Sequence, residues 1–127
     1  AILTEAQTLV AKECRILMAI IHRSFELFMQ SDCNDFAHLQ AIPDHIVWLI
    51  GVARFLEWDR VSTLLMEVHR YVQAVLSASV TVKRESLDIL ADVTVSIDHL
   101  FERMEAHKSI DLKSLELAEV SVRALDI

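Results

Sequence analysis

Glycine and proline are almost absent from this chain of 127 residues, which contains one of each, Gly51 and Pro43. Both residue types are common in turns, so their scarcity argues against a turn-rich β architecture. Hydrophobic residues make up 54% of the sequence without strand-like alternation, and we predict an all-α domain. A single glycine also excludes the glycine-rich loops that hold nucleotide phosphates.

Long uncharged apolar runs are missing as well, since none approaches the roughly 18 residues that a membrane span needs. We therefore predict no membrane insertion. Basic residues are outnumbered 12 to 19, and the net charge of −7 argues against binding to nucleic acid or anionic membranes. The two cysteines, Cys14 and Cys33, lack CxxC spacing, and we expect them to be reduced thiols in a cytoplasmic protein.

The chain has neither an initiator methionine nor a signal-peptide pattern. We expect residues 1–127 to form a single domain that is excised from a longer protein. The mean hydropathy of +0.37 is high for such a domain. It predicts an apolar surface that binds a partner or a second copy.

Capping residues and apolar spacing predict an antiparallel up-down helical bundle. Thr4 opens a capping box, Asp59 and Asp111 are candidate N-caps, and Pro43 either starts a new helix or bends a longer one. The predicted helices cover about residues 4–30, 34–41, 43–57, 60–78, 82–107 and 112–126.

Apolar spacing predicts an inward stripe on most of these helices. In the first helix the stripe comprises Val10, Leu17, Ile20, Ile21, Leu27 and Phe28. Because residues 16–21 are apolar nearly all round, we expect the middle of this helix to be covered on more than one side. In the helix over 82–107 the stripe has the 3-4-3-4-3 spacing of a bundle seam: Leu87, Leu90, Thr94, Ile97, Phe101 and Met104.

The stretch from residue 46 to 57 is the most apolar and contains the only glycine. A glycine in the middle of a helix costs about 1 kcal/mol relative to alanine, so it indicates close approach of another group. Positions three, four and seven apart share a helix face. Val47, Ile50, Gly51 and Arg54 therefore form one candidate surface.

The five residues that end at Gly51 resemble the core motif of histidine phosphotransfer (HPt) domains, His-x-Leu/Val-Lys/Gln-Gly. Leu49 and Gly51 match the motif. Val47 stands where the phosphoacceptor histidine would be, and Ile50 replaces the Lys/Gln. The resemblance extends over roughly residues 33–107. It is closest to the HPt-like domains of the pilus regulator FimL and of ChpA-type twitching-motility chemosensory kinases.

This resemblance implies an HPt-like bundle with an additional C-terminal helix and without a phosphoacceptor. In working HPt domains the corresponding surface binds a receiver domain. We expect a non-enzymatic scaffold without cofactors in chemosensory, two-component signalling that controls type IV pili. The implied partner is a CheY-like receiver domain or a pilus-pole hub protein. The candidate partner-binding face comprises Val47, Ile50, Gly51, Arg54 and Trp58. Whether the C-terminal helix covers this face stays open.

Several alternatives remain at this stage. An active phosphotransfer protein could use a displaced histidine such as His45 or His69, although His45 lies about 200° around the helix from Val47. The domain could also be the dimerisation module of a hybrid kinase, closing a two-fold interface with its apolar face. A zinc site at Cys33, His38 and His45 lacks the usual ligand spacing. No nucleophile motif supports catalysis.

Overall fold

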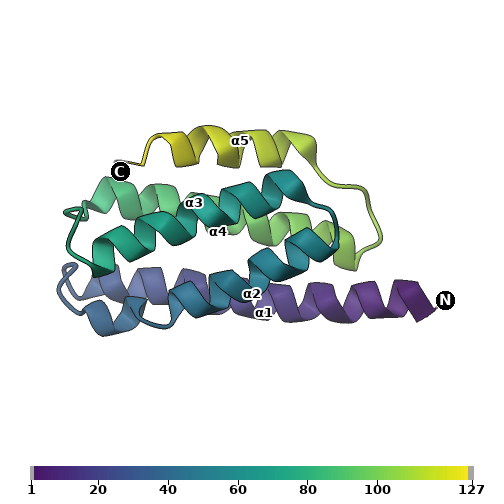
Figure 1. Ribbon diagram of the computed structural model, residues 1–127, viewed down its shortest axis with the longest axis horizontal. Helices are drawn as coiled ribbons and strands as arrows, with labels where there is room; N and C mark the ends of the chain where they lie inside the picture. The colour runs from purple at the N-terminus through teal and green to yellow at the C-terminus, as the bar shows by residue number, and fades with distance from the viewer. Residues whose placement is uncertain (1, 126–127) are drawn as a thin grey trace.

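The computed structural model describes residues 2–125 and the side chains from Thr4 onward, and in this part of the chain every regular element is helical. The elements are α1 (Ile2–Gln30), the short 3-10 helix η1 (Phe36–Leu39), α2 (Ile42–Phe55), α3 (Asp59–Leu76), α4 (Arg84–Glu105) and α5 (Leu112–Arg123). Successive α-helices run in opposite directions (Figure 1). The prediction of an all-α, antiparallel bundle is confirmed.

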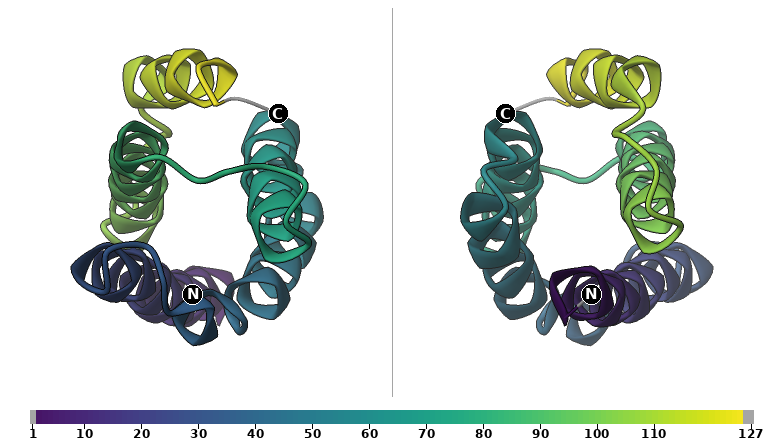
Figure 2. Two further views of the ribbon diagram at one scale, coloured as in Figure 1. Left: turned by 90° about the vertical axis from the view of Figure 1, so that its left-hand side faces the viewer. Right: turned by 90° about the vertical axis from the view of Figure 1, so that its right-hand side faces the viewer.

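The helices form two layers, as the end-on views in Figure 2 show. One layer consists of α1, α4 and α5, because α4 packs on both of its neighbours, and the other consists of α2 and α3. The side chains between the layers form one hydrophobic core. The additional helix α5 packs on α4 and also contacts α3. It therefore covers the side of the bundle that lies away from α2.

The predicted inward stripe of α4 is confirmed, since all six of its residues are buried. The stripe predicted for α1 is partly wrong. Ile16 and Ile20 are 54% and 43% exposed, so the middle of α1 is not covered on more than one side. Its neighbours α4, α2 and η1 leave the outer side of α1 open. The buried stripe has 3-4-3-4-3 spacing and comprises Ala11, Cys14, Met18, Ile21, Phe25 and Phe28.

The helix starts agree only in part with the predicted caps. Asp111 caps α5 as expected, because its carboxylate accepts hydrogen bonds from the backbone N–H groups of Lys113 and Ser114 at 3.2 and 3.3 Å. Thr4 is not a cap, since α1 already begins at Ile2. Asp59 is the first residue of α3, and the N-cap position belongs to Trp58. The tight turn that ends α2 places the cap one residue earlier than the sequence pattern predicts.

Pro43 lies in the first turn of α2, so a new helix begins there and the two segments do not form one bent helix. The predicted short helix over 34–41 is reduced to η1, one 3-10 turn. Asp35 caps η1, because its carboxylate accepts a hydrogen bond from the backbone N–H of Ala37. Because the chain breaks between η1 and α2, the apolar stretch around Gly51 lies in a helix of its own.

Several helices end in a left-handed residue that is not glycine. Glu57, Ala78 and His107 have φ values near +60° after α2, α3 and α4. The residue that follows each of them donates a backbone hydrogen bond to the carbonyl five positions earlier, at 2.8–2.9 Å. Glycine is the usual residue at such positions because it has no Cβ. The chain forms these turns without it.

Ion pairs join the helices across the surface. Arg15 of α1 contacts three carboxylates of α4, with distances of 3.1–3.4 Å to Asp98, Glu102 and Glu105. Arg60 of α3 donates two hydrogen bonds to Glu119 of α5, which lower the pKa of that carboxyl group. These pairs help to fix the positions of α1 and α5. Within residues 2–125, no helix combines the length and apolarity that crossing a membrane requires.

Candidate partner-binding site

The outward face of α2 is open to solvent. Its inward residues Ile46, Leu49 and Ala53 are fully buried, which turns the opposite side of the helix outward. There Val47 is 56% exposed, and Gly51 is exposed as well. The additional helix α5 lies across α3 and α4. The structure thus resolves the question of coverage, because α5 does not shield this face.

A shallow apolar groove of about 330 Å³ lies between this face and α1. Two large aromatic side chains stand at its edge, Trp48 with 46% and Phe55 with 87% of its surface exposed. Exposed apolar side chains that gather in one patch, as Val47, Trp48 and Phe55 do here, indicate a binding surface. The lining residues are Val10 of α1 and Val47, Trp48, Gly51, Val52 and Phe55 of α2.

The face predicted from the sequence covers only part of this groove. It includes Val47 and Gly51 but leaves out Trp48, Val52 and Phe55. The missed residues have the same three-four-seven spacing, counted from Trp48 and including Gly51. Periodicity alone predicts this second register, whereas the motif resemblance favours the register that begins at Val47.

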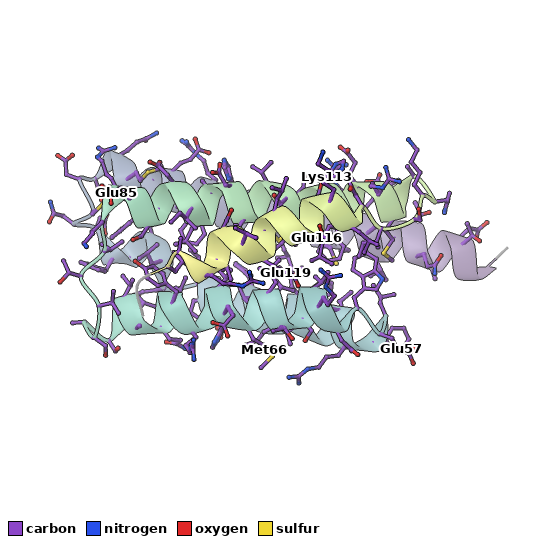
Figure 3. All side chains as sticks on the ribbon, turned by 90° about the horizontal axis from the view of Figure 1, so that it is seen from above. Glu57, Met66, Glu85, Lys113, Glu116 and Glu119 are labelled. Atoms are coloured by element: carbon purple, nitrogen blue, oxygen red, sulfur yellow. The ribbon has the colours of Figure 1, made fainter. Side chains whose placement is uncertain are left out.

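The other predicted residues of α2 lie toward α3. Ile50 is half-buried against the core. Arg54 is exposed, and its Nη2 atom lies 3.6 Å from Sδ of Met66 on α3. Figure 3 shows Met66 projecting from the outer edge of α3. Arg54 therefore places one positive charge on the side of the apolar face that borders α3.

Trp58 lies apart from this groove. It is half-buried and stacks on Phe101 of α4, with ring centroids 5.5 Å apart and an angle of 25° between the rings. It also lines a separate groove of about 340 Å³ beside α5, together with Asp59, Arg60 and Leu112 among others. The structure thus brings together Val47 and Gly51, places Ile50 and Arg54 next to them, and separates Trp58.

The fold itself does not require glycine at position 51. A Cβ atom built on Gly51 would meet no atom within 4 Å, and the backbone there is helical. Left-handed positions such as Glu57 and Ala78, where glycine would relieve strain, carry other residues. The only glycine is thus placed where it lowers stability, in the middle of an exposed helix face. This placement favours close approach of a group from outside the domain.

Replacing Gly51 with alanine is expected to raise the free energy of unfolding by about 1 kcal/mol, because alanine loses less backbone entropy in a helix. Urea unfolding followed by circular dichroism measures this change. The reverse substitution at an exposed helical alanine, Ala19→Gly on α1, is the matched control and should lower stability by a similar amount. A loss of stability in Gly51→Ala would contradict the open space at this position.

The candidate histidines are distributed over the surface. His45 and His69 are half-buried on α2 and α3. His38 lies 3.4 Å from the carboxylate of its neighbour Asp35. Among the described residues, no group of three or more histidine, cysteine, aspartate or glutamate side chains is arranged to hold a metal ion.

Neither cysteine lines the groove on α2. Cys14 is fully buried in the inward stripe of α1, and burial raises the pKa of its thiol to about 12. A thiol with so high a pKa is protonated at neutral pH and is a poor nucleophile. Cys33 is half-buried near the end of α1, and neither residue forms a disulfide.

Comparison with known proteins identifies one family. A family model described as the FimL C-terminal domain matches residues 1–122, which is nearly the whole chain. No curated protein and no solved structure gave a match.

Proposed function

Because the chain belongs to the FimL C-terminal domain family, we propose that it is a pilus-related regulatory domain that binds a protein partner without transferring a phosphoryl group. The partner proposed is a CheY-like receiver domain or a pilus-pole hub protein of a chemosensory pathway that controls type IV pili and twitching motility. The domain is proposed to act as a cytoplasmic scaffold. Its binding surface is the groove between α1 and α2.

The observation that carries this proposal is the apolar face around Gly51. Val47, Trp48 and Phe55 expose about half or more of their side chains. Covering each of them in a complex would contribute roughly 1.5–3 kcal/mol at most. Gly51 between them lets a partner approach the backbone of α2. Rigid aromatic side chains beside a small residue are typical of interface hot spots.

Phosphotransfer is not supported at this face for a chemical reason. Phosphoryl transfer to an HPt domain requires an imidazole nitrogen as nucleophile, and Val47 has a hydrocarbon side chain in that position. Ile50, in place of the motif's Lys/Gln, has no donor to hold a phosphate. The proposed mechanism is therefore recognition alone, in which an apolar surface replaces a reactive one.

A phosphotransfer assay tests this proposal. The domain is incubated with a phosphorylated CheY-like receiver domain, and its intact mass is measured together with its binding to the receiver. We expect binding without the gain of about 80 Da that one phosphoryl group adds. The Val47→His variant is the matched control, since it returns an imidazole to the motif position. A gain mapped to His45 or His69 in the unchanged domain would overturn the proposal.

A further inference from the structure

The outer side of α1 carries a second apolar seam that the other helices in the described part of the chain leave largely exposed. Leu9 and Ile16 are 65% and 54% exposed, and Ile20 is 43% exposed. Leu27 is half-buried but does not belong to the side chains that pack on the core. Helix α1 packs mainly on α4 and also contacts η1 and α2, and Figure 1 shows α1 along the lower edge of the bundle.

This outer seam has the periodicity of a coiled coil. Its positions step 4-3-4-3-4 along the helix and comprise Leu9, Glu13, Ile16, Ile20, Arg23 and Leu27. Each of these six positions lies two residues from a residue of the buried stripe, and two residues correspond to about 200° around a helix. One helix therefore has two heptad patterns on nearly opposite faces. The inner one builds the core, and the outer one faces solvent.

The outer seam is complementary to itself when a second copy runs antiparallel. With a two-fold axis at the level of Met18, Leu9 faces Leu27 of the second copy and Ile16 faces Ile20. The same register places Glu13 opposite Arg23 of the second copy. This pairing of a and d positions is the arrangement of antiparallel coiled coils.

The charges beside the seam agree with this register. Lys12 and Glu26 occupy the flanking positions that face each other between antiparallel copies, and their signs are opposite. In a parallel pair each residue would face its own copy, so Glu13 would meet Glu13 and Arg23 would meet Arg23. Such like-charge contacts are destabilising. Charge therefore selects the antiparallel pair.

Within one chain, Glu13 and Arg23 are too far apart to form an ion pair with each other. They are ten residues apart on one helix, about 15 Å along its axis. Both are exposed, and within the part of the chain that the structure describes neither side chain forms a hydrogen bond or ion pair. The unusual feature of this seam is its row of exposed apolar residues, and its two charges are complementary across a two-fold axis.

We propose that the domain forms a symmetric homodimer through an antiparallel α1–α1 coiled coil, in which Glu13 of each copy pairs with Arg23 of the other. This interface is centred on the outer seam of α1, whereas the groove is lined by five residues of α2 and by Val10, which is not a seam residue. The proposal does not depend on the identity of the groove's partner. A dimer would present two such grooves to one target, which raises the apparent affinity.

A charge-swap series tests the proposal on the 127-residue chain by light scattering after size-exclusion chromatography. We expect a mass of about 29 kDa, twice the 14.5 kDa of one chain, at a concentration of about 100 µM. Glu13→Arg alone and Arg23→Glu alone place like charges across the axis at two equivalent sites. Each single variant should raise the dissociation constant of the dimer at least tenfold. The measured mass should then fall to about that of the monomer. The double variant should restore the dimer.

Restoration is the decisive outcome, because residues 13 and 23 do not contact each other within one chain. A monomeric unchanged protein, or a double variant no more dimeric than the single ones, would overturn the proposal. Circular dichroism measures whether each variant stays folded. We expect all of them to do so, because substitutions at exposed helix positions usually change stability little. Val47→Arg in the α2 groove should leave the dimer mass unchanged. Loss of the dimer in that variant would instead place the interface at the groove.

Discussion

Replacing Phe101 with alanine is expected to lower the free energy of unfolding by about 3–5 kcal/mol, a large share of the 5–15 kcal/mol that stabilises a typical domain. Phe101 is fully buried near the C-terminal end of α4 and stacks on Trp58 at the N-cap of α3. Its removal leaves a cavity where the two layers meet. Urea unfolding followed by far-ultraviolet circular dichroism measures the loss.

The matched control for this prediction is the same substitution at Phe55. That side chain is 87% exposed at the end of α2, so Phe55→Ala should change stability by no more than about 0.5 kcal/mol. Its effect should appear in partner binding, because Phe55 lines the groove. If Phe55→Ala were as destabilising as Phe101→Ala, Phe55 would belong to the fold and not to an interface.

Replacing Val47 with arginine is expected to weaken binding of a CheY-like receiver domain by about a hundredfold or more while leaving helicity intact. In the free domain the side chain is 56% exposed, so the guanidinium group reaches water without disturbing the core. In a complex the same group would be buried against an apolar groove without a partner charge. Gly51→Arg should act similarly by filling the space through which a partner approaches.

Titration calorimetry measures the affinity of these variants, and circular dichroism measures their helicity. Val120 of α5 provides a matched control, since it is 60% exposed and lies on the helix that packs on α4 and α3, away from the groove. Val120→Arg introduces the same charge and should leave affinity unchanged. Unchanged affinity in both Val47→Arg and Gly51→Arg would remove this face from the proposed function.

The contrast between α4 and α1 shows how far periodicity predicts a core. In α4 one apolar stripe is present, and the residues chosen from sequence, such as Leu90 and Ile97, are all buried. In α1 apolar residues occur on two faces. The sequence-based stripe mixed Ile21, which is buried, with Ile20, which is 43% exposed. Two stripes with the same period cannot be distinguished in the sequence. The packing of the neighbouring helices decides which of them is buried.

The candidate site shows a similar division. The sequence located the right helix, because an apolar run that contains a single glycine is recognisable without coordinates. It did not locate Val10, which lies 37 residues before Val47 and lines the same groove. It also placed Trp58 on the face, whereas the turn at Glu57 directs Trp58 toward Phe101 of α4.

By itself the sequence determined the features that arise from neighbouring residues: the helical class, the approximate helix boundaries, the cap at Asp111 and the unusual position of Gly51. Propensity, capping and periodicity act within a few residues, so they can be read along the chain. The tertiary structure alone decided which seam of α1 is buried, that α5 covers α3 and α4 instead of α2, and that Phe55 is exposed. These outcomes depend on which helices pack together, and burial depends on contacts between residues far apart in the chain.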